Sequence, residues 1–160
     1  MSVQLLLNIF IAFLWMLLAD EWGSLNFIMG YLVGLGLIFI MRRFFTTEFY
    51  MVKLLAMAKL LGVFIRELIS SSVFVIKQVL SPQMTFEPGI FQLETKLEGD
   101  WEVTALSLLI TLTPGSVAME VAPGGKLLYI HAMDMPSAQS TVVKTIYAFE
   151  KAIMGVTRNV

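Results

Sequence analysis

The chain has 160 residues, a formal net charge of −1 and no cysteine. This charge gives no support for nucleic-acid binding, and the lack of cysteine excludes disulfides, thiolate catalysis and cysteine-ligated metals. Hydrophobic residues make up 58% of the chain and charged residues 14%, whereas ordinary soluble domains are about 45–50% apolar and about 25% charged. The deficit of charge falls on the stretch before Arg42, which indicates that the first part of the chain lies in a membrane.

Two long apolar runs, residues 3–19 and 25–41, predict a transmembrane hairpin. Each run is about long enough to cross the hydrocarbon core of a bilayer, and the polar residues 20–24 predict a tight turn between them. A cleaved signal peptide is the alternative for the first run. It is disfavoured because a signal begins with basic residues, whereas the first basic residue here is Arg42.

The basic residues that follow the second run predict its orientation. Arg42 and Arg43 close the run, and Lys53 and Lys59 follow. Because Lys and Arg are enriched on the cytoplasmic side of membranes, we expect this end and the N-terminus in the cytoplasm and the acidic turn outside.

The second run also carries a spacing typical of close helix packing. Gly30 and Gly34 form a G-x-x-x-G pattern, which places both glycines on one helix face and lets another backbone approach. That face packs either on the first span or on a partner subunit, and the sequence leaves both alternatives open. Asn26, at the mouth of the span, is expected to be a cap or an interhelical hydrogen bond. We therefore take Asn26, Gly30 and Gly34 as a candidate packing or partner interface.

Residues 49–80 predict a long helix with one basic stripe. At about 100° per residue, Lys59, Arg66, Ser70 and Lys77 fall within a narrow arc. Such a helix can lie in the headgroup layer with the stripe toward lipid phosphates. These three basic residues, together with Arg42 and Arg43, are therefore candidate membrane-surface residues.

The alternative for this segment is a third span, which would have to bury its charged side chains against partners at substantial cost. The number of spans decides on which side of the membrane the rest of the chain lies. The C-terminal part is cytoplasmic with two spans and external with three. The interfacial helix, and hence a cytoplasmic C-terminal part, is favoured.

The remaining part of the chain predicts a small α/β domain. Alternating apolar and polar residues, two turns rich in glycine and two helical runs give the order strand, helix, strand, strand, helix over residues 91–98, 101–112, 116–121, 126–132 and 134–154. Asp100 is expected to cap the first of these helices. The last helix is expected to bury Val142, Ile146, Phe149 and Ile153 and to end at Gly155.

The predicted fold class is thus a membrane α-helical hairpin with a long amphipathic interfacial helix and a small β-α-β-β-α domain. The corresponding domains are residues 1–44, 45–82 and 83–160.

The sequence contains no pattern that predicts catalysis. His131 and Asp134 form a His-Asp pair close in sequence, but no nucleophile motif accompanies it, and a hydrogen bond that fixes the loop is the expected role. Residues 113–116 lack the glycines and the lysine of a phosphate loop and predict a helix end followed by a strand. With one histidine and no cysteine, a metal site is not expected either. We therefore expect no enzyme activity, no cofactor and no metal.

Neither predicted span contains a carboxylate, lysine or histidine in its interior. Because ion paths through membranes need polar or ionisable groups, the chain is expected to be unable to conduct protons or cations alone. It is expected to position or stabilise other proteins.

Three motifs occur in an order and spacing that resemble a known family: residues 26–31 with Gly34 and the Arg42–Arg43 pair, residues 111–116, and residues 129–134. They resemble the E subunit (MrpE) of the Mrp-type multisubunit Na⁺/H⁺ antiporters, and the resemblance covers essentially the whole chain. One departure is Ser116, where the family often has threonine, so that the hydroxyl is kept.

The resemblance implies a multi-pass protein of a bacterial plasma membrane, in a complex of several hydrophobic subunits that exchanges protons for sodium. It further implies an accessory role in assembly or stability, because the large subunits of such complexes carry the ion-translocating residues. Two other functions remain open. The chain could be a small homo-oligomeric transporter that uses Asp20, Arg66 or Glu67, or a membrane-anchored cytoplasmic binding module.

Overall fold

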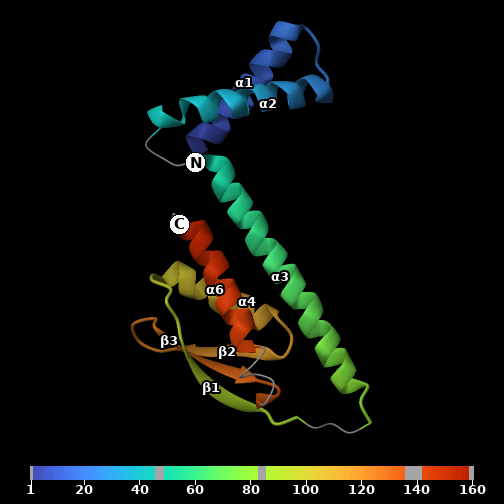
Figure 1. The fold of residues 1–160 in the computed structure, drawn as a ribbon, viewed down its shortest axis with the longest axis vertical. Coiled ribbons are helices and arrows are strands. Elements are labelled where there is room, and N and C mark those ends of the chain that lie inside the picture. Colours follow the sequence, from blue (N-terminus) through green and yellow to red (C-terminus); the bar gives the residue numbers. More distant parts are fainter. Residues whose placement is uncertain (1, 46–48, 83–85, 136–141, 159–160) are drawn as a thin grey trace. The chain divides into compact units, whose positions relative to one another are not determined.

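The computed structural model describes residues 2–45, 49–82, 86–135 and 142–158 of the chain (Figure 1). It divides into two compact units, Met1–Leu55 and Ala56–Val160, which are described separately. The final helix was expected to begin within residues 134–137, and residues 136–141 lie outside the described part.

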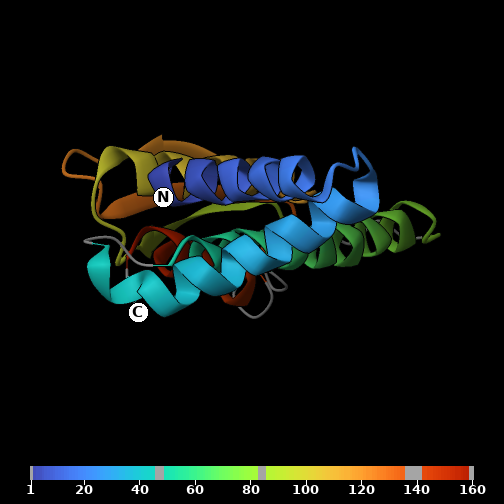
Figure 2. The same ribbon diagram turned by 90° about the horizontal axis from the view of Figure 1, so that it is seen from above.

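The first unit is a helical hairpin of α1 (Ser2–Ala19) and α2 (Ser24–Ile40), the latter extended by a short 3₁₀ helix, η1 (Met41–Phe44). Figure 2 shows the two helices running back from the turn that joins them. Asp20 adopts a positive φ of 52° in this turn. Within the described residues, Ser2–Ala19 and Ser24–Phe44 are the two helices long and apolar enough to cross a membrane.

The long helix α3 (Tyr50–Val79) forms where the sequence predicts it. From Ala56 onward it belongs to the second unit, where Leu60, Val63 and Phe64 pack against the hydrophobic core. These three residues recur at the three- and four-residue spacing of one helix face. The opposite face of α3 is apolar and exposed.

The second unit also contains a three-stranded antiparallel sheet of β1 (Gly89–Glu94), β2 (Ser116–Val121) and β3 (Leu127–Ala132). The strand order is β1-β3-β2, so that β3 is central. Its Ile130 pairs with Phe91 on one side and with Ala118 on the other, and a bulge follows between Ala118 and Glu120.

One face of this sheet carries the core, together with α4 (Asp100–Leu112) and α6 (Val143–Thr157) (Figure 1). The core side chains are at most 1% exposed at Leu97, Leu106, Ile110, Leu128, Ile130, Ile146 and Phe149. Two residues of the expected apolar stripe of the last helix, Ile146 and Phe149, are thus at the centre of the core, with Ile153 beside them at 2% exposure. The central strand β3 alternates accessible and buried residues, as expected where one face of an antiparallel sheet packs on the core.

Several boundaries differ from the sequence predictions, three of them for reasons that the structure shows. Strand β1 ends at Glu94, because Thr95 and the residues after it turn into a network of polar contacts. Asp100 is the first residue of α4 and does not cap it; the N-cap is Gly99, whose φ of 98° makes the turn. Helix α6 continues through Gly155 to Thr157, and the backbone N–H of Arg158 donates to the carbonyl of Met154 at 2.8 Å.

Candidate functional site

A small cavity lies within the second unit, with a volume of about 150 Å³. We call it the α3 pocket. Its walls come from α3, the end of α4 and the turn after it, the end of β3, and α6. The lining residues are Glu67, Ser70, Ser71, Phe74, Ile110, Thr113, Pro114, Gly115, Ser116, Met133, Asp134, Val142, Thr145, Ile146 and Phe149. Two of the three motifs noted in the sequence therefore contribute residues to one cavity.

Glu67 is the carboxylate that α3 presents to this pocket. Its side chain is 18% exposed, and the hydroxyl of Thr145 on α6 donates to its Oε2 at 2.8 Å. The neighbouring Arg66 is 85% exposed, and its Nε lies 4.0 Å from Oε1 of Glu67, at the outer limit of an ion pair. Glu67 thus links α3 to α6 through one hydroxyl.

The turn of residues 113–116 supplies hydrogen-bond donors to the last carbonyls of α4. The hydroxyl of Thr113 donates to the carbonyl of Leu109 at 2.7 Å, and that of Ser116 donates to the carbonyl of Ile110 at 3.3 Å. Gly115 supplies the positive φ of 96° that the turn requires. Since the last carbonyls of a helix lack intrahelical donors, these hydroxyls have a structural role, and α4 ends where β2 begins.

His131 and Asp134 are positioned by different parts of the fold. His131 lies on β3 between two buried residues, Ile130 and Ala132, so its side chain points to the face of the sheet away from the core. Asp134 lines the α3 pocket, and its Oδ1 accepts the backbone N–H of Glu87 at 3.5 Å. This bond ties the end of β3 to the segment before β1.

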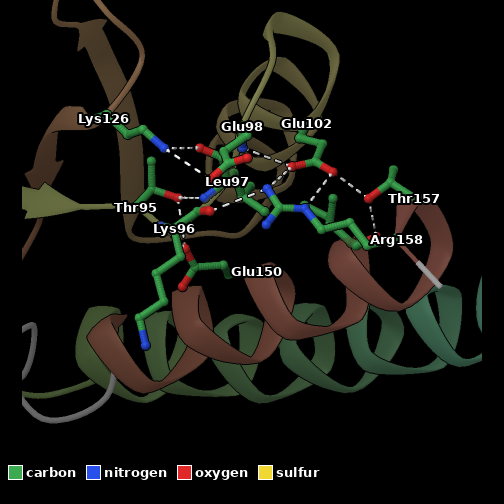
Figure 3. A network of polar contacts seen from close by, with 10 residues as sticks. Thr95, Lys96, Leu97, Glu98, Glu102, Lys126, Glu150, Thr157 and Arg158 are labelled. Atoms are coloured by element: carbon green, nitrogen blue, oxygen red, sulfur yellow. Dashed lines mark hydrogen bonds and ion pairs between the residues drawn. The ribbon is translucent and has the colours of Figure 1, made fainter. Parts of the chain in front are cut away.

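A polar network at the other end of the second unit was not predicted from the sequence (Figure 3). Arg158 donates from Nη2 to Oε2 of Glu102 at 2.8 Å and from Nε to Oε1 at 3.3 Å. The hydroxyl of Thr157 and the backbone N–H of Glu98 also donate to this carboxylate. The bidentate Arg158 guanidinium, helped by these two donors, lowers the pKa of Glu102 from 4.5 to about 2 although burial opposes the shift.

A second carboxylate, Glu150 of α6, completes this network (Figure 3). Its Oε1 accepts the hydroxyl of Thr95 at 2.8 Å and the backbone N–H of Lys96. Glu102 is the third residue of α4, a position that often carries a glutamate that reaches back to a preceding N–H. No local pattern identifies its contact with Arg158, which is 56 residues away.

The candidate interface residues of α2 lie in two different environments. A Cβ added at Gly30 would lie 2.6 Å from Cβ of Trp15, and one added at Gly34 would lie 2.1 Å from Oδ1 of Asn8. Both glycines therefore face α1 and permit its close approach. Asn26 is partly exposed in the first turn of α2, and its Nδ2 donates to Oε2 of Glu21 at 2.8 Å.

Buried polar side chains also connect the hairpin to the first residue of α3. Nδ2 of Asn8 donates to the hydroxyl of Tyr50 at 2.7 Å, and this hydroxyl lies 2.9 Å from that of Tyr31. The backbone N–H of Tyr50 donates to Oε1 of Gln4 at 2.9 Å. In the sequence, Gln4 and Asn8 only interrupt an apolar run, but their four-residue spacing places them on one helix face.

The candidate membrane-surface residues are all exposed. Arg42 and Arg43 lie in η1, and the guanidinium of Arg42 stacks 4.8 Å from the centre of the Phe39 ring. Lys59, Arg66 and Lys77 follow one border of the exposed side of α3. In the described part of the chain, no group of three or more histidine and acidic residues could hold a metal ion.

Comparisons with known proteins place this arrangement in a family. A family model described as MNHE, Na⁺/H⁺ ion antiporter subunit, matches residues 8–156. The chain belongs to the MNHE family of Na⁺/H⁺ ion antiporter subunits. The resemblance noted from the sequence motifs is thereby confirmed.

Two relatives match this chain over almost its whole length. It is 48% identical to the E subunit of the Na(+)/H(+) antiporter of Bacillus subtilis strain 168, over 99% of this chain and 100% of the relative. It is 41% identical to the E subunit of the Na(+)/H(+) antiporter of Alkalihalophilus pseudofirmus, with the same coverage. The chain is therefore a subunit of a multisubunit membrane antiporter.

A solved structure shows a similar fold. It is a chain of the membrane-bound sulfane sulfur reductase, an archaeal respiratory membrane complex. The TM-score is 0.54 and the sequence identity 24%, over 96% of this chain and 98% of the other. The similarity supports two apolar N-terminal helices followed by a helix and a small three-stranded domain.

Proposed function

We propose that the chain is an accessory, non-catalytic subunit of a multisubunit monovalent cation/proton antiporter, and that it supports the assembly and stability of the ion-translocating subunits. One observation carries this proposal. The interiors of α1 and α2 contain no carboxylate, lysine or histidine, and the buried amides of α1, Gln4 and Asn8, hydrogen-bond with Tyr50. Because ion paths in membranes are lined by ionisable groups, the path belongs to other subunits.

The test is the removal of this chain from the native complex. We expect the remaining subunits to fall in abundance, or to separate on gentle extraction, with antiport activity falling in proportion. Neutral replacement of Asp20 or Arg66 in the otherwise intact complex should leave transport per assembled complex unchanged. Loss of transport with normal assembly in either variant would instead support a transporting role.

The proposed partners are the other hydrophobic subunits and the lipid bilayer of a bacterial plasma membrane. In this arrangement α1 and α2 span the membrane with the N-terminus inside. Helix α3 lies in the cytoplasmic headgroup layer, and the α/β part is cytoplasmic. What supports the placement of α3 is its outer face, which is apolar and 44–58% exposed at Leu61, Ile65, Ile69, Val73 and Ile76, with Lys59, Arg66 and Lys77 along one border.

The side of the α/β part can be tested directly, because the chain has no native cysteine. Gly23→Cys in the turn of the hairpin and Glu120→Cys on β2 are both at exposed positions. In intact cells, a membrane-impermeant maleimide should label the first variant and should label the second only after the cells are opened. Labelling of Glu120→Cys in intact cells would favour a third span.

A further inference from the structure

Glu67 is in an unusual place for a carboxylate. It is the only acidic residue of α3, and it lies on the face whose Leu60, Val63 and Phe64 pack against the core. Lys59, Arg66 and Lys77 of the same helix are on its exposed side. Placing a charge on a packed face is unfavourable unless the charge gains a partner.

The contacts that Glu67 makes with other described residues use only part of its carboxylate. An ionised carboxylate has two oxygens with about four acceptor positions. Thr145 fills one of them, and Arg66 is largely in solvent at 4.0 Å. These contacts therefore link α3 to α6. They offset little of the free-energy cost of placing the Glu67 charge on the packed face.

The α3 pocket beside Glu67 has the volume and lining to receive a group that supplies that compensation. An apolar cavity of about 150 Å³ holds a molecule as large as benzene, and the α3 pocket has about this volume. Phe74, Ile110, Ile146 and Phe149 make its walls apolar, and its charged lining residues among those described are Glu67 and Asp134, both acidic. The best-matched occupant is a group with an apolar stem and a cationic head.

We propose that the α3 pocket receives the side chain of a lysine or arginine from another subunit of the antiporter. The methylene stem lies along the apolar walls, as such stems do on apolar surfaces, and the cationic head pairs with the carboxylate of Glu67. This inference rests on the proposed function, since it requires a partner subunit, and it assigns that contact to one residue.

Two matched variants separate the charge from the link between helices. Glu67→Gln removes the charge but keeps an oxygen that can accept the Thr145 hydroxyl. Thr145→Val keeps the carboxylate and removes the hydroxyl. Each variant is tagged, extracted gently from its native membrane, and compared with the unaltered chain for the amount of other antiporter subunits recovered per tagged chain.

We expect Glu67→Gln to lower this recovery by roughly tenfold, because removing one partner of a buried charge pair mainly speeds dissociation. Thr145→Val should retain most of it. Unchanged recovery with Glu67→Gln overturns the inference, as does an equal loss with both variants. If the unaltered chain recovers no other subunit, the proposed function itself fails, which is a separate result.

A crosslinking experiment tests the same contact and does not depend on how well the complex survives extraction. Ser70 lines the pocket and is exposed, so Ser70→Cys can carry a short photoreactive maleimide in this cysteine-free chain. In the assembled complex it should crosslink to a segment of another subunit that contains a lysine or arginine, and adding Glu67→Gln should reduce that crosslink. A crosslink only to this chain, or one insensitive to Glu67→Gln, contradicts the proposal.

Discussion

Arg158 and Glu102 meet through two hydrogen bonds although 56 residues separate them, with Nη2 of the arginine 2.8 Å from Oε2 of the glutamate. The pair joins the residue that follows α6 to the first turn of α4. Since the Glu102 side chain is 9% exposed and that of Arg158 34%, the ion pair is partly shielded from water. Such pairs have more effect on stability than fully exposed ones.

The first prediction concerns pH. The pKa of Glu102 is lowered from 4.5 to about 2 in the folded chain, so its carboxylate stabilises the fold above pH 4.5, and this stabilisation is lost as the pH falls toward 2. The check is the thermal unfolding of the full chain in detergent across this range, beside Glu102→Gln. The difference between the two midpoints should shrink as the pH is lowered. A difference that stays constant would show that the ionised form is not what stabilises the fold.

The second prediction concerns the glycines of α2. Gly30→Ala should destabilise the hairpin, because its Cβ would lie 2.6 Å from Cβ of Trp15 and 3.0 Å from the backbone of Ala12. We expect a cost of about 1–3 kcal/mol, as for other overpacked sites, in the detergent-induced unfolding of the chain. Gly36→Ala is the matched control, since a Cβ there has nothing within 4 Å. Equal effects of the two substitutions would contradict this packing.

The third prediction concerns the bond between Asn8 and Tyr50. Asn8→Ala, Tyr50→Phe and the double variant form a cycle that measures their coupling. Polar contacts between membrane helices average about 0.6 kcal/mol and reach about 1.7 kcal/mol in such cycles, and we expect the upper part of this range because the bond is 2.7 Å long and buried. Additive effects would show that the bond contributes nothing measurable.

The fourth prediction concerns the outer face of α3. A fluorescent label on Ile69→Cys should be quenched by lipid-borne quenchers in proteoliposomes, because Ile69 lies on the exposed apolar face. The same label on Glu120→Cys of β2 serves as the control and should be quenched less. Replacing Lys59, Arg66 and Lys77 by glutamine should reduce the quenching at Ile69 more in vesicles with phosphatidylglycerol than in pure phosphatidylcholine, since each basic residue near an anionic surface contributes about 1 kcal/mol. Equal quenching at both labelled sites would argue against contact between α3 and lipid.

Local patterns in the sequence predicted most of the elements. The two apolar runs correspond to α1 and α2, and the hairpin predicted over residues 116–132 corresponds to β2 and β3. The ends of helices and strands were harder to predict. Asp100 has the side chain of a typical cap, but Gly99, at positive φ, makes the turn before α4. Which residue caps a helix depends on backbone geometry, and the residue types alone do not reveal that geometry.

Most contacts of the candidate site could not be predicted from local sequence patterns. Glu67, Thr113 and Thr145 are far apart in sequence and meet only because α3, the turn after α4 and α6 converge on one cavity. Gln4 and Asn8 appeared as defects in an apolar run, although their shared helix face could have indicated buried polar contacts. Long-range contacts of this kind depend on the register of packing, which no local pattern encodes.

The strand order β1-β3-β2 has a consequence for synthesis of the chain on the ribosome. Strand β1 and helix α4 are made before β3, and among the described strands β1 pairs only with β3. Until Leu127–Ala132 has emerged, β1 therefore lacks its partner in the sheet, a condition that favours aggregation. Both apolar N-terminal helices are complete long before that point. A nascent chain that stops before Leu127 would carry a finished hairpin and an unfinished sheet, which makes such truncated chains natural substrates for chaperones and proteases.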